Sequence, residues 1–584
     1  MIGNWFEQIN NSIPIRLCTT FLLIFTINFC FAQSASIEID GVFNDWHETL
    51  TTEKDPSESI SGIDLLSLSL TNDRDYLFIR LKADKEFDFS DNIIDHNIHI
   101  YLDTDNDAST GDSKFTEFGA DLVLNLKDRR VNFYNPNLNS ISLNDIHLRV
   151  APTVTSNSFE IAIPRNVMPD GQNRLFKASN LKLIVANLSN NDRIPNSGNL
   201  LYDFDESRLN GYDLVDINKR SDDLIRIVAY NTLSNGLTDL MRKSHFEKII
   251  KAIKPDIIGF SECWNTEANY VKSIMDQWLP LNTDDGWYVE KQIDRGLITA
   301  SKWEILDRWE ELPNQFPVLI NLPDKYSSDI LFTNAHLNCC GNESGRQDQV
   351  DAYSRFINDA KTKGGEIDLS RNTPFVYAGD LNLVGYSQQL NTLISGDIQN
   401  TIEYGLPSYP DWDDSEVSDL ISLHSDSRFS FTWKNENGSY PPGKLDYILY
   451  SDAVVSVEKS FVLRTEEMNV SRLGKYGLDI NNTESASDHF PVIADFEVTK
   501  SLNKVNSIFP TSIQLIPNPA KNQINISSNT KMNTYQIFNV LGKKVLSGVL
   551  TNPTIQIESL YTGSYFIVLK ETNTNKTYRK KFIK

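Results

Sequence analysis

Six short polar motifs occur in order between residues 222 and 497, and several directly follow an apolar run. An apolar run at 225–230 leads into a stretch with helical spacing, and 257–260 is the next strand-like run. The apolar residues of the helical stretch are Leu237, Leu240, Met241, Ile249, Ile250 and Ile253. Alternating strand and helix patterns are typical of a layered α/β domain, which places its sites where buried strands end. These motifs are therefore expected to carry the chemistry.

The motifs combine hard oxygen donors with two imidazoles. They are Tyr230-Asn231-Thr232, Ser261-Glu262, Asn334-Ala335-His336-Leu337-Asn338, Gly379-Asp380-Leu381-Asn382, Leu445-Asp446-Tyr447 and Ser487-Asp488-His489-Phe490-Pro491. Carboxylate and amide oxygens suit Mg²⁺ or Mn²⁺, and no histidine–cysteine cluster has the spacing of a zinc site. Singly, each motif also fits an ordinary turn or a buried histidine. Their joint occurrence at strand ends favours phosphodiester hydrolysis, with the histidines exchanging protons with phosphate oxygens.

The same motifs, with Phe431-Thr432-Trp433 ahead of the fifth, resemble the signatures of the endonuclease/exonuclease/phosphatase superfamily. This is the fold of DNase I, exonuclease III-type repair enzymes and bacterial sphingomyelinases. The resemblance spans residues 222–497 and implies a four-layer α/β sandwich with two packed sheets. It also implies a hydrolase of phosphate esters that uses Mg²⁺ or Mn²⁺ as its cofactor.

The resemblance assigns a metal site and a phosphate site. Glu262 would be the main Mg²⁺ ligand, supported by Asn231 and Asp488. Asp380 and Asn382 would position the phosphate and the attacking water. These residue types agree with the chemistry, since hard cations prefer oxygen ligands.

The resemblance also assigns the proton transfers. His489, held by Asp446, would move protons at the scissile phosphate, and His336 would lie opposite it. DNase I-like members orient the second histidine with an acidic residue. Asp294 is the matching residue in this sequence.

Residues 36–216 have a β pattern of short apolar runs separated by Asn, Asp, Gly and Ser, which predicts an N-terminal β-sandwich beginning with a strand at 37–39. Residues 39–46 resemble the start of family 9-like carbohydrate-binding or DOMON-like sandwiches, which implies contact with a cell surface or polysaccharide. Asp103, Asp105 and Asp107 alternate in a loop that either binds Ca²⁺ or forms a solvated turn, and it lacks the EF-hand pattern. Trp46 is expected to fill the core rather than to bind sugar.

The N-terminus has the pattern of an export signal at 1–32. An arginine precedes the apolar run at 17–32, which is short for a bilayer span of ~20 residues. An uncleaved anchor is the alternative. Removal of the signal leaves Cys263, Cys339 and Cys340, an odd number that implies a free thiol or an intermolecular bond. Beside the motifs, these cysteines are either small buried residues or a disulfide near the site.

Residues 510–584 are basic while the whole chain is acidic, and their short strands predict a separate small β-sandwich. The order of Leu515-Ile516-Pro517-Asn518-Pro519-Ala520 and the final Lys580-Lys581-Phe582-Ile583-Lys584 resembles a type A sorting domain of the type IX secretion system. This implies contact with that secretion machinery, a secreted or cell-surface location, and removal of the tail. An ordinary adhesive β domain is the alternative.

The formal net charge of −23 excludes a polybasic nucleic-acid binder, although a bound divalent cation would invert the field at the site. The leading hypothesis is a secreted, metal-dependent phosphodiesterase, an extracellular nuclease that acts as a monomer. The alternatives are a sphingomyelinase or phospholipase C-like enzyme with an aromatic hairpin in 404–440, a sugar- or inositol-phosphate phosphatase, and an inert surface-binding protein. Because every candidate residue follows position 221, the sandwich is expected to be dispensable for hydrolysis of a small diester.

Overall fold

The structure is a computed structural model that describes residues 36–46, 51–57, 61–89, 93–134, 138–208, 211–498, 514–527, 532–539, 543–571 and 577–584. The expected signal peptide at 1–32 lies outside these residues. The chain divides into two compact units, Met1–Ser501 and Leu502–Lys584. In the described part of the chain, no helix has both the length and the apolar character needed to cross a bilayer.

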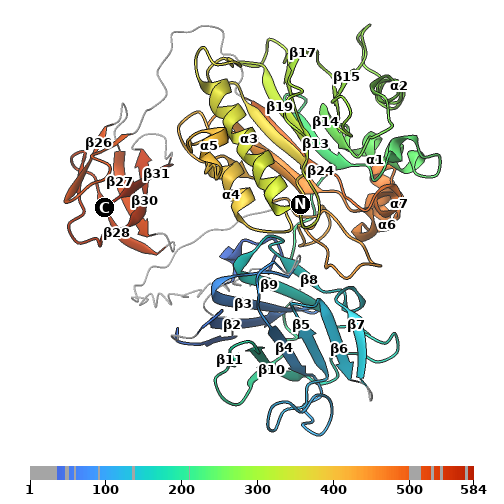
Figure 1. Cartoon of the computed structure of the whole chain (residues 1–584), viewed down its shortest axis with the longest axis vertical. Coiled ribbons are helices and arrows are strands. Elements are labelled where there is room, and N and C mark those ends of the chain that lie inside the picture. Colours follow the sequence, from blue (N-terminus) through green and yellow to red (C-terminus); the bar gives the residue numbers. More distant parts are fainter. Residues whose placement is uncertain are drawn as a thin grey trace, which may run out of the picture. The chain divides into compact units, whose positions relative to one another are not determined.

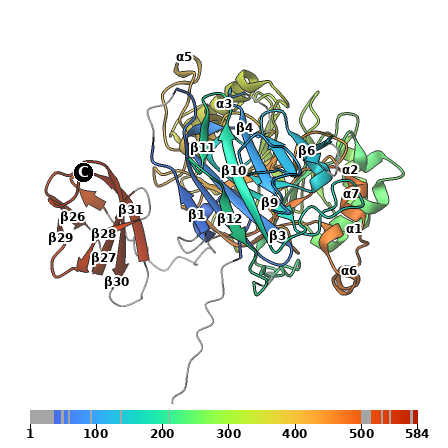
Figure 2. The same ribbon diagram turned by 90° about the horizontal axis from the view of Figure 1, so that it is seen from below.

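Two antiparallel sheets form the N-terminal sandwich, whose strands Figure 2 shows from below. The five-stranded sheet has the order β1 (Thr51–Lys54), β2 (Leu65–Asn72), β3 (Tyr76–Phe87), β9 (Ser156–Pro164), β8 (Arg149–Ala151). The other has the order β11 (Asp192–Ile194), β10 (Asn180–Asn187), β4 (Ile98–Asp103), β5 (Leu122–Asn125), β6 (Arg130–Tyr134), β7 (Leu138–Ser142), and β12 (Leu200–Asp203) also pairs with β10. Residues such as Leu68, Phe159 and Leu183 fill the core between them, while short 3₁₀ turns at Phe43–Asp45 (η1) and Asn144–Ile146 (η2) lie outside the sheets.

Two six-stranded mixed sheets form the central α/β domain, which is the expected catalytic domain. The first has the order β15 (Tyr288–Lys291), β16 (Ile298–Ser301), β14 (Ile257–Ser261), β13 (Ile225–Asn231), β24 (Val492–Val498), β23 (Val455–Val462). The second has the order β17 (Ile305–Arg308), β18 (Gln315–Ile320), β19 (Ile330–His336), β20 (Phe375–Asp380), β22 (Asp446–Tyr450), β21 (Ser418–Asp419). Within the two sheets, β13 runs parallel to β14 and β19 runs parallel to β20.

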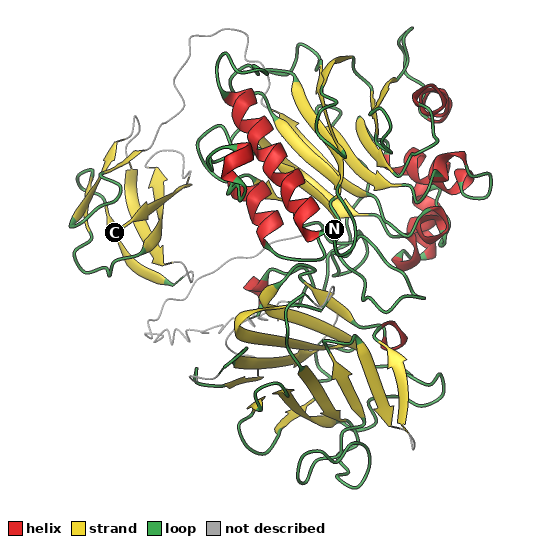
Figure 3. Cartoon of the chain, in the orientation of Figure 1, coloured by secondary structure: helices red, strands yellow, loops and turns green. Residues whose placement is uncertain are grey.

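Helices cover the outer face of each sheet, so the domain has four layers (Figures 1 and 3). The first sheet packs against α1 (Lys243–Ile253), α2 (Ala268–Trp278), α6 (Val470–Tyr476) and α7 (Asn482–Ala486). The second packs against α3 (Glu343–Lys361) and α4 (Gln388–Ser395), and the shorter elements are η3 (Gly236–Thr238), α5 (Thr401–Tyr404) and η4 (Thr465–Glu467). Strand β13 shows the cause of this layering, because Ile227 and Ala229 face the other sheet while Val228 and Tyr230 face the helices. The predicted fold class is therefore confirmed.

The expected helix before Ile253 is shorter than its apolar pattern predicts. Helix α1 begins only at Lys243, after the η3 turn, and the side chains of Leu240 and Met241 are 89% and 82% exposed. The cause is local. The carboxylate of Asp239 accepts the backbone N–H of Met241, which holds this segment in a turn.

The N-terminal sandwich and the catalytic domain share one apolar core. Ile39, Phe78 and Ala151 pack in the same cluster as Phe429 and other residues between the catalytic sheets. The expected first strand at 37–39 does not join the sandwich. Instead, Ile39 pairs with Phe429 of the catalytic domain, through backbone hydrogen bonds with Arg428 and Ser430.

The C-terminal unit is a small all-β structure. A three-stranded sheet has the order β25 (Gln514–Ile516), β26 (Gln523–Ser527), β29 (Thr554–Gln556). A four-stranded sheet has the order β28 (Lys544–Val549), β27 (Met532–Asn539), β30 (Ser564–Glu571), β31 (Thr577–Ile583). Ile524, Ile555 and Ile567 are buried in its core, so this unit has an interior of its own.

Candidate active site

The candidate residues meet at one edge of the two packed sheets. Parallel strands carry their C-terminal ends to the same edge, and an antiparallel strand starts there. Accordingly, the site residues follow or end four parallel strands and precede or begin two antiparallel ones. They are Asn231 at β13, Glu262 after β14, His336 at β19, Asp380 at β20, Asp446 at β22 and His489 before β24.

Glu262, His336 and Asp380 form a cluster that fits a metal ion. Each offers one ligand atom, and these atoms lie within 4.8 Å of one another. The side-chain nitrogen of Asn231 donates to Glu262 Oε1 at 3.0 Å and to Asp380 Oδ2 at 2.8 Å, and the Ser234 N–H donates to Glu262 Oε2 at 2.8 Å. Two carboxylates gathered at one point suit a hard divalent cation.

Backbone geometry at the strand ends brings these side chains together. Glu262 and Asn382 adopt positive φ angles of 57° and 49°, which are uncommon for residues other than glycine and often occur at functional turns. At Gly379, a Cβ atom would lie 1.9 Å from the carbonyl oxygen of Ala335. Glycine therefore allows the close approach of β20 to β19, which carries Asp380 next to His336.

His489 and Asp446 form a buried dyad beside the cluster. His489 Nδ1 lies 2.7 Å from Asp446 Oδ2, which leaves His489 Nε2 facing Asp380 Oδ2 at 3.6 Å. Burial alone would lower the pKa of His489, but the carboxylates of Asp446, Asp380 and Asp488 outweigh it and raise the pKa to about 10. The Thr432 hydroxyl accepts the N–H of Asp446 at 2.8 Å, so the dyad is fixed from both sides.

Three predicted site residues lie differently from the others. Asp488 is not among the described residues whose ligand atoms gather in the metal cluster, and its Oδ2 accepts the indole N–H of Trp433 at 3.0 Å. The side chain of Asn382 donates to the carbonyl of Leu337, which ties two strand-end segments together. Asp294 lies exposed between β15 and β16, and no hydrogen bond joins it to His336 within the described chain. Its orienting function stays a prediction.

Three contacts at the site involve residues to which the sequence analysis assigned no site function. Trp433 holds Asp488, and the backbone of Ser234 holds Glu262. The ring of Trp264 lies 5.8 Å from that of His336 between centroids, and its side chain is 46% exposed. Only the position of Trp433 in Phe-Thr-Trp, and of Trp264 two residues after Glu262, could have drawn attention to them.

The cysteines near the site take two different forms. Cys339 and Cys340 are joined to each other, and both are exposed. Arg346 donates to the carbonyls of Asn338 and Cys340 at 2.9 and 2.6 Å. Cys263 is a fully buried free thiol whose pKa burial raises to about 12. The disulfide therefore adjoins the His336 motif, and Cys263 belongs to the core.

The acidic loop of the sandwich brings together a different set of carboxylates from the expected one. Asp103, Asp105 and Asp121 place oxygens within 4.8 Å of one another, and Lys182 lies 3.3 Å from Asp103 Oδ2. Asp107 instead accepts hydrogen bonds from Ser109. A Ca²⁺ site here stays a prediction, with Asp121 rather than Asp107 as the third carboxylate in reach.

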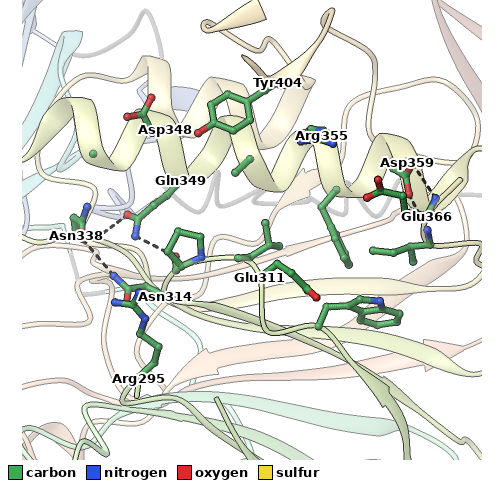
Figure 4. A pocket seen from close by; sticks show the side chains of 17 residues that line it. Arg295, Glu311, Asn314, Asn338, Asp348, Gln349, Arg355, Asp359, Glu366 and Tyr404 are labelled. Atoms are coloured by element: carbon green, nitrogen blue, oxygen red, sulfur yellow. Dashed lines mark hydrogen bonds between the residues drawn. The ribbon is translucent and has the colours of Figure 1, made fainter. Parts of the chain in front are cut away.

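A cavity of about 690 Å³ runs beside the candidate site along α3 (Figure 4). It extends from Arg295 and Asn338, next to the His336 motif, to Asp359 and Glu366. None of the residues in the metal cluster or the dyad lines it. Its charged lining consists of Arg295, Arg355, Glu311, Asp348, Asp359 and Glu366. Carboxylates outnumber guanidinium groups, so this cavity is poorly suited to a polyanion.

Comparison with protein families gives two matches. Residues 228–489 match the Endonuclease/Exonuclease/phosphatase family, and residues 514–584 match the secretion system C-terminal sorting domain. Neither match extends over the N-terminal sandwich, so its likeness to carbohydrate-binding domains stays a prediction. Comparison with curated proteins gives no match.

Solved structures similar to the chain each cover about half of it. D. rerio TDP2 in complex with a single-strand DNA product has 15% identity and a TM-score of 0.31, over 47% of this chain and 99% of that one. The human Nocturnin catalytic domain with bound sulfate has 17% identity and a TM-score of 0.30, over 49% and 97%. Sphingomyelinase C from Streptomyces griseocarneus has 17% identity and a TM-score of 0.27, over 47% and 99%.

The two family matches agree with the site and with the C-terminal unit as the structure describes them. A sorting domain directs a protein to the secretion machinery, so the predicted secreted or cell-surface location is confirmed. The strand-end cluster lies within the matched region that ends at His489. The chain therefore carries an endonuclease/exonuclease/phosphatase family domain at residues 228–489 and a secretion-system sorting domain at its C-terminus.

Proposed function

We propose that the protein is a divalent-metal-dependent phosphodiester hydrolase that acts outside the cell, with nucleic acid as its substrate. One observation carries the proposal. The Asp446–His489 dyad and the Glu262–His336–Asp380 cluster converge on a single point, because Asp380 Oδ2 lies 3.5 Å from His336 Nε2 and 3.6 Å from His489 Nε2. A group for proton transfer and a cation site therefore adjoin each other, as hydrolysis of a phosphodiester requires.

Different residues of the chain would bind the metal, transfer protons and position the metal ligands. Glu262 and Asp380 would hold Mg²⁺ or Mn²⁺, which supplies positive charge to the phosphate oxygens when bound. Asp446 holds His489 through the Nδ1 atom of the imidazole. The Nε2 atom of His489 then faces the substrate side and can hold or release a proton there. His336 lies across Asp380 from His489 and can donate to a phosphate oxygen. Asn231 and Ser234 keep Glu262 in place.

The exposed indole beside His336 supports nucleic acid as the substrate. Aromatic side chains next to a phosphate site can stack on a base, which favours a nucleotide over a small alkyl ester.

A lipid substrate is the second candidate. Ile402 in α5 and Leu406 just after this helix are 99% and 80% exposed. Such apolar side chains can enter a membrane surface. Residues 404–440, which could supply either the aromatic hairpin of a membrane-active enzyme or an ordinary loop, are mostly irregular.

A substrate panel tests the proposal. The purified protein is assayed on supercoiled DNA, RNA, sphingomyelin vesicles and bis-p-nitrophenyl phosphate, with and without a chelator. Cleavage of DNA or RNA that stops on chelation and returns with Mg²⁺ is the expected result. Hydrolysis of sphingomyelin alone would select the lipid candidate. Lack of hydrolysis of all four substrates would overturn the proposal and favour an inert surface-binding protein.

Glu262→Gln links any activity to this site. The amide keeps an oxygen but loses the charge that holds a hard cation, so turnover is expected to fall by roughly 10²-fold or more and to be partly restored by excess Mg²⁺. Glu267→Gln is the matched control, because Glu267 is exposed five residues later at the start of α2. Equal activity of both variants at low Mg²⁺ would remove Glu262 from the site.

A further inference from the structure

A loop of the catalytic domain extends from the active site to the N-terminal sandwich. This 433–443 loop is closed at its base, where Trp433 and Gly443 exchange backbone hydrogen bonds of 3.0 and 3.2 Å. The same base contacts the site, because Trp433 donates to Asp488 and Lys434 donates its backbone N–H to the carbonyl of Asp488. A displacement of the loop would therefore change the position of Asp488.

Asn144 of the sandwich holds the tip of this loop. Its side-chain nitrogen lies 3.1, 2.9 and 3.1 Å from the carbonyl oxygens of Asn435, Gly438 and Tyr440. Asn144 is 8% exposed, while most of the loop tip is exposed. The two N–H donors of one buried amide are thus shared among three carbonyl oxygens, which fixes the path of an irregular segment.

Other sandwich residues contact the loop at Tyr440 and the chain on either side of its base. The guanidinium of Arg129 lies over the ring of Tyr440 at 4.3 Å, and that of Arg149 lies over Phe431 at 5.2 Å. Just after the base of the loop, the Thr153 hydroxyl accepts the N–H of Lys444 at 2.8 Å. These contacts come from different segments of the sandwich, so the loop is held by the sandwich as a whole.

The loop forms one wall of a cavity next to the catalytic centre. The cavity has a volume of about 370 Å³, with residues 434–437 on one side and 484–488 on the other. Leu233 and Arg242 also line it. Since Asp488 belongs to this lining, the part of a substrate that extends beyond the scissile phosphate on this side would lie against the loop.

We propose that Asn144 is a positioning residue for hydrolysis, and that the sandwich is a structural part of the substrate site rather than an independent module. By fixing the 433–443 loop, Asn144 maintains the wall that binds the group attached to the scissile phosphate. The proposal rests on the proposed hydrolase function. It assigns to the sandwich a function that does not depend on sugar binding.

The test compares two phosphodiesters of different size. Asn144→Ala and the matched control Asn173→Ala, on an exposed turn of the same sandwich, are assayed on bis-p-nitrophenyl phosphate and on methyl p-nitrophenyl phosphate. Loss of a wall that binds the second aryl group raises KM with little change in kcat. For Asn144→Ala we expect a KM increase of roughly 5–30-fold on the larger ester and less than about 3-fold on the smaller one. Asn173→Ala should match the wild type.

Two further measurements keep the test decisive if Asn144→Ala folds poorly. Tyr440→Ala removes a contact from the loop side, at a residue that is 37% exposed, and should give the same dependence on ester size. Amide hydrogen exchange of residues 433–443 should speed up in both variants while β13 and β20 stay protected. Equal losses on both esters, or unchanged KM with unchanged exchange, would overturn the proposal. If the wild type hydrolyses neither ester, the hydrolase proposal fails, and exchange alone decides whether Asn144 holds the loop.

Discussion

At the residue scale, Trp264 offers a test of the proposed nucleic-acid substrate. Its indole is exposed beside His336, so a base next to the scissile phosphate can stack on it. Stacking on an aromatic side chain contributes ~1–3 kcal/mol per base, which corresponds to roughly 5–150-fold in affinity. We expect Trp264→Ala to raise KM on an oligonucleotide within that range and to leave KM on methyl p-nitrophenyl phosphate unchanged.

Steady-state kinetics on both substrates check this prediction. Tyr409→Ala serves as the control, because Tyr409 is 44% exposed but its segment bonds to the C-terminal end of α3, away from the His336 motif. An unchanged KM of Trp264→Ala on the oligonucleotide would argue against base stacking at this position.

The His489–Asp446 dyad makes a second prediction at this scale. In the proposed mechanism Asp446 acts through the imidazole that it holds, so the two residues are expected to behave as one unit. His489→Ala and Asp446→Asn should each lower kcat, by up to roughly 10²–10⁴-fold for loss of acid–base catalysis, with small effects on KM. The double variant should lose little more than the worse single variant. A loss equal to the product of the two would show that the residues act independently.

At the scale of elements, η4 is linked through His424 to Phe431, the residue before Thr432. Glu467 of η4 lies 2.8 Å from His424 Nδ1, and His424 Nε2 lies 2.7 Å from the carbonyl of Phe431. Burial would raise the pKa of Glu467, but His424, Arg464 and Ser427 hold it well below its usual range. A depressed carboxyl pKa stabilises the folded state above the ordinary value of 4.5, and this stabilisation is lost as the pH falls.

Glu467→Gln should therefore be destabilised at pH 7 and lose less stability than the wild type between pH 5 and 3.5. Loss of hydrogen bonds to charged groups costs about 1.5–3 kcal/mol at neutral pH. Urea unfolding at pH 7, 5 and 3.5 measures both effects. Glu458→Gln is the control, because Glu458 pairs with Arg220 at the surface. Parallel pH curves for the wild type and Glu467→Gln would contradict the prediction.

The elements also show how far the sequence could predict this site. Asn231, Glu262, His336 and Asp380 are each marked by the apolar strand that precedes them, so local pattern sufficed to gather them at one edge. The partner of Asp488 is Trp433, 55 residues away, and no local pattern records such a contact. Leu240 and Met241 fit a helical face, but the turn held by Asp239 keeps them outside the helix. Long-range contacts and competing side-chain hydrogen bonds are therefore the features of this site that the sequence could not predict.

At the scale of the whole molecule, the shared core bears on whether the catalytic domain can exist alone. The expectation that cleavage at residue 221 leaves an active domain assumed that the sandwich has no part in the core. Ile39, Trp46, Phe78, Ala151 and Ala162 belong to the cluster between the catalytic sheets, and removal of the sandwich would expose their partners. Burial of a large apolar side chain stabilises by about 1.5–3 kcal/mol, so several such losses are severe for a domain of this size.

Residues 222–501 expressed alone should be insoluble, or should unfold at a Tm lower by roughly 10 °C or more than that of residues 36–501. Thermal unfolding and hydrolysis of methyl p-nitrophenyl phosphate measure the loss. Residues 36–501 provide the matched control, since they lack only the terminal segments. A soluble fragment 222–501 with unchanged kcat/KM would restore the view that the sandwich is dispensable.

The position of β24 has a consequence for when the protein first becomes active. Strand β13, the earliest strand of the catalytic domain, pairs with β24, its latest, and Arg226 binds Asp495 across this pair at 2.6 and 2.7 Å. Roughly 260 residues separate Asn231 from His489, which corresponds to about 15–50 s of synthesis on the ribosome. During the first part of this time the nascent chain lacks Asp380 and so has no complete metal cluster, and after Asp380 is made it still lacks His489 and strand β24. The full set of proposed catalytic residues is therefore present only once His489 has been synthesised, at the end of the catalytic domain.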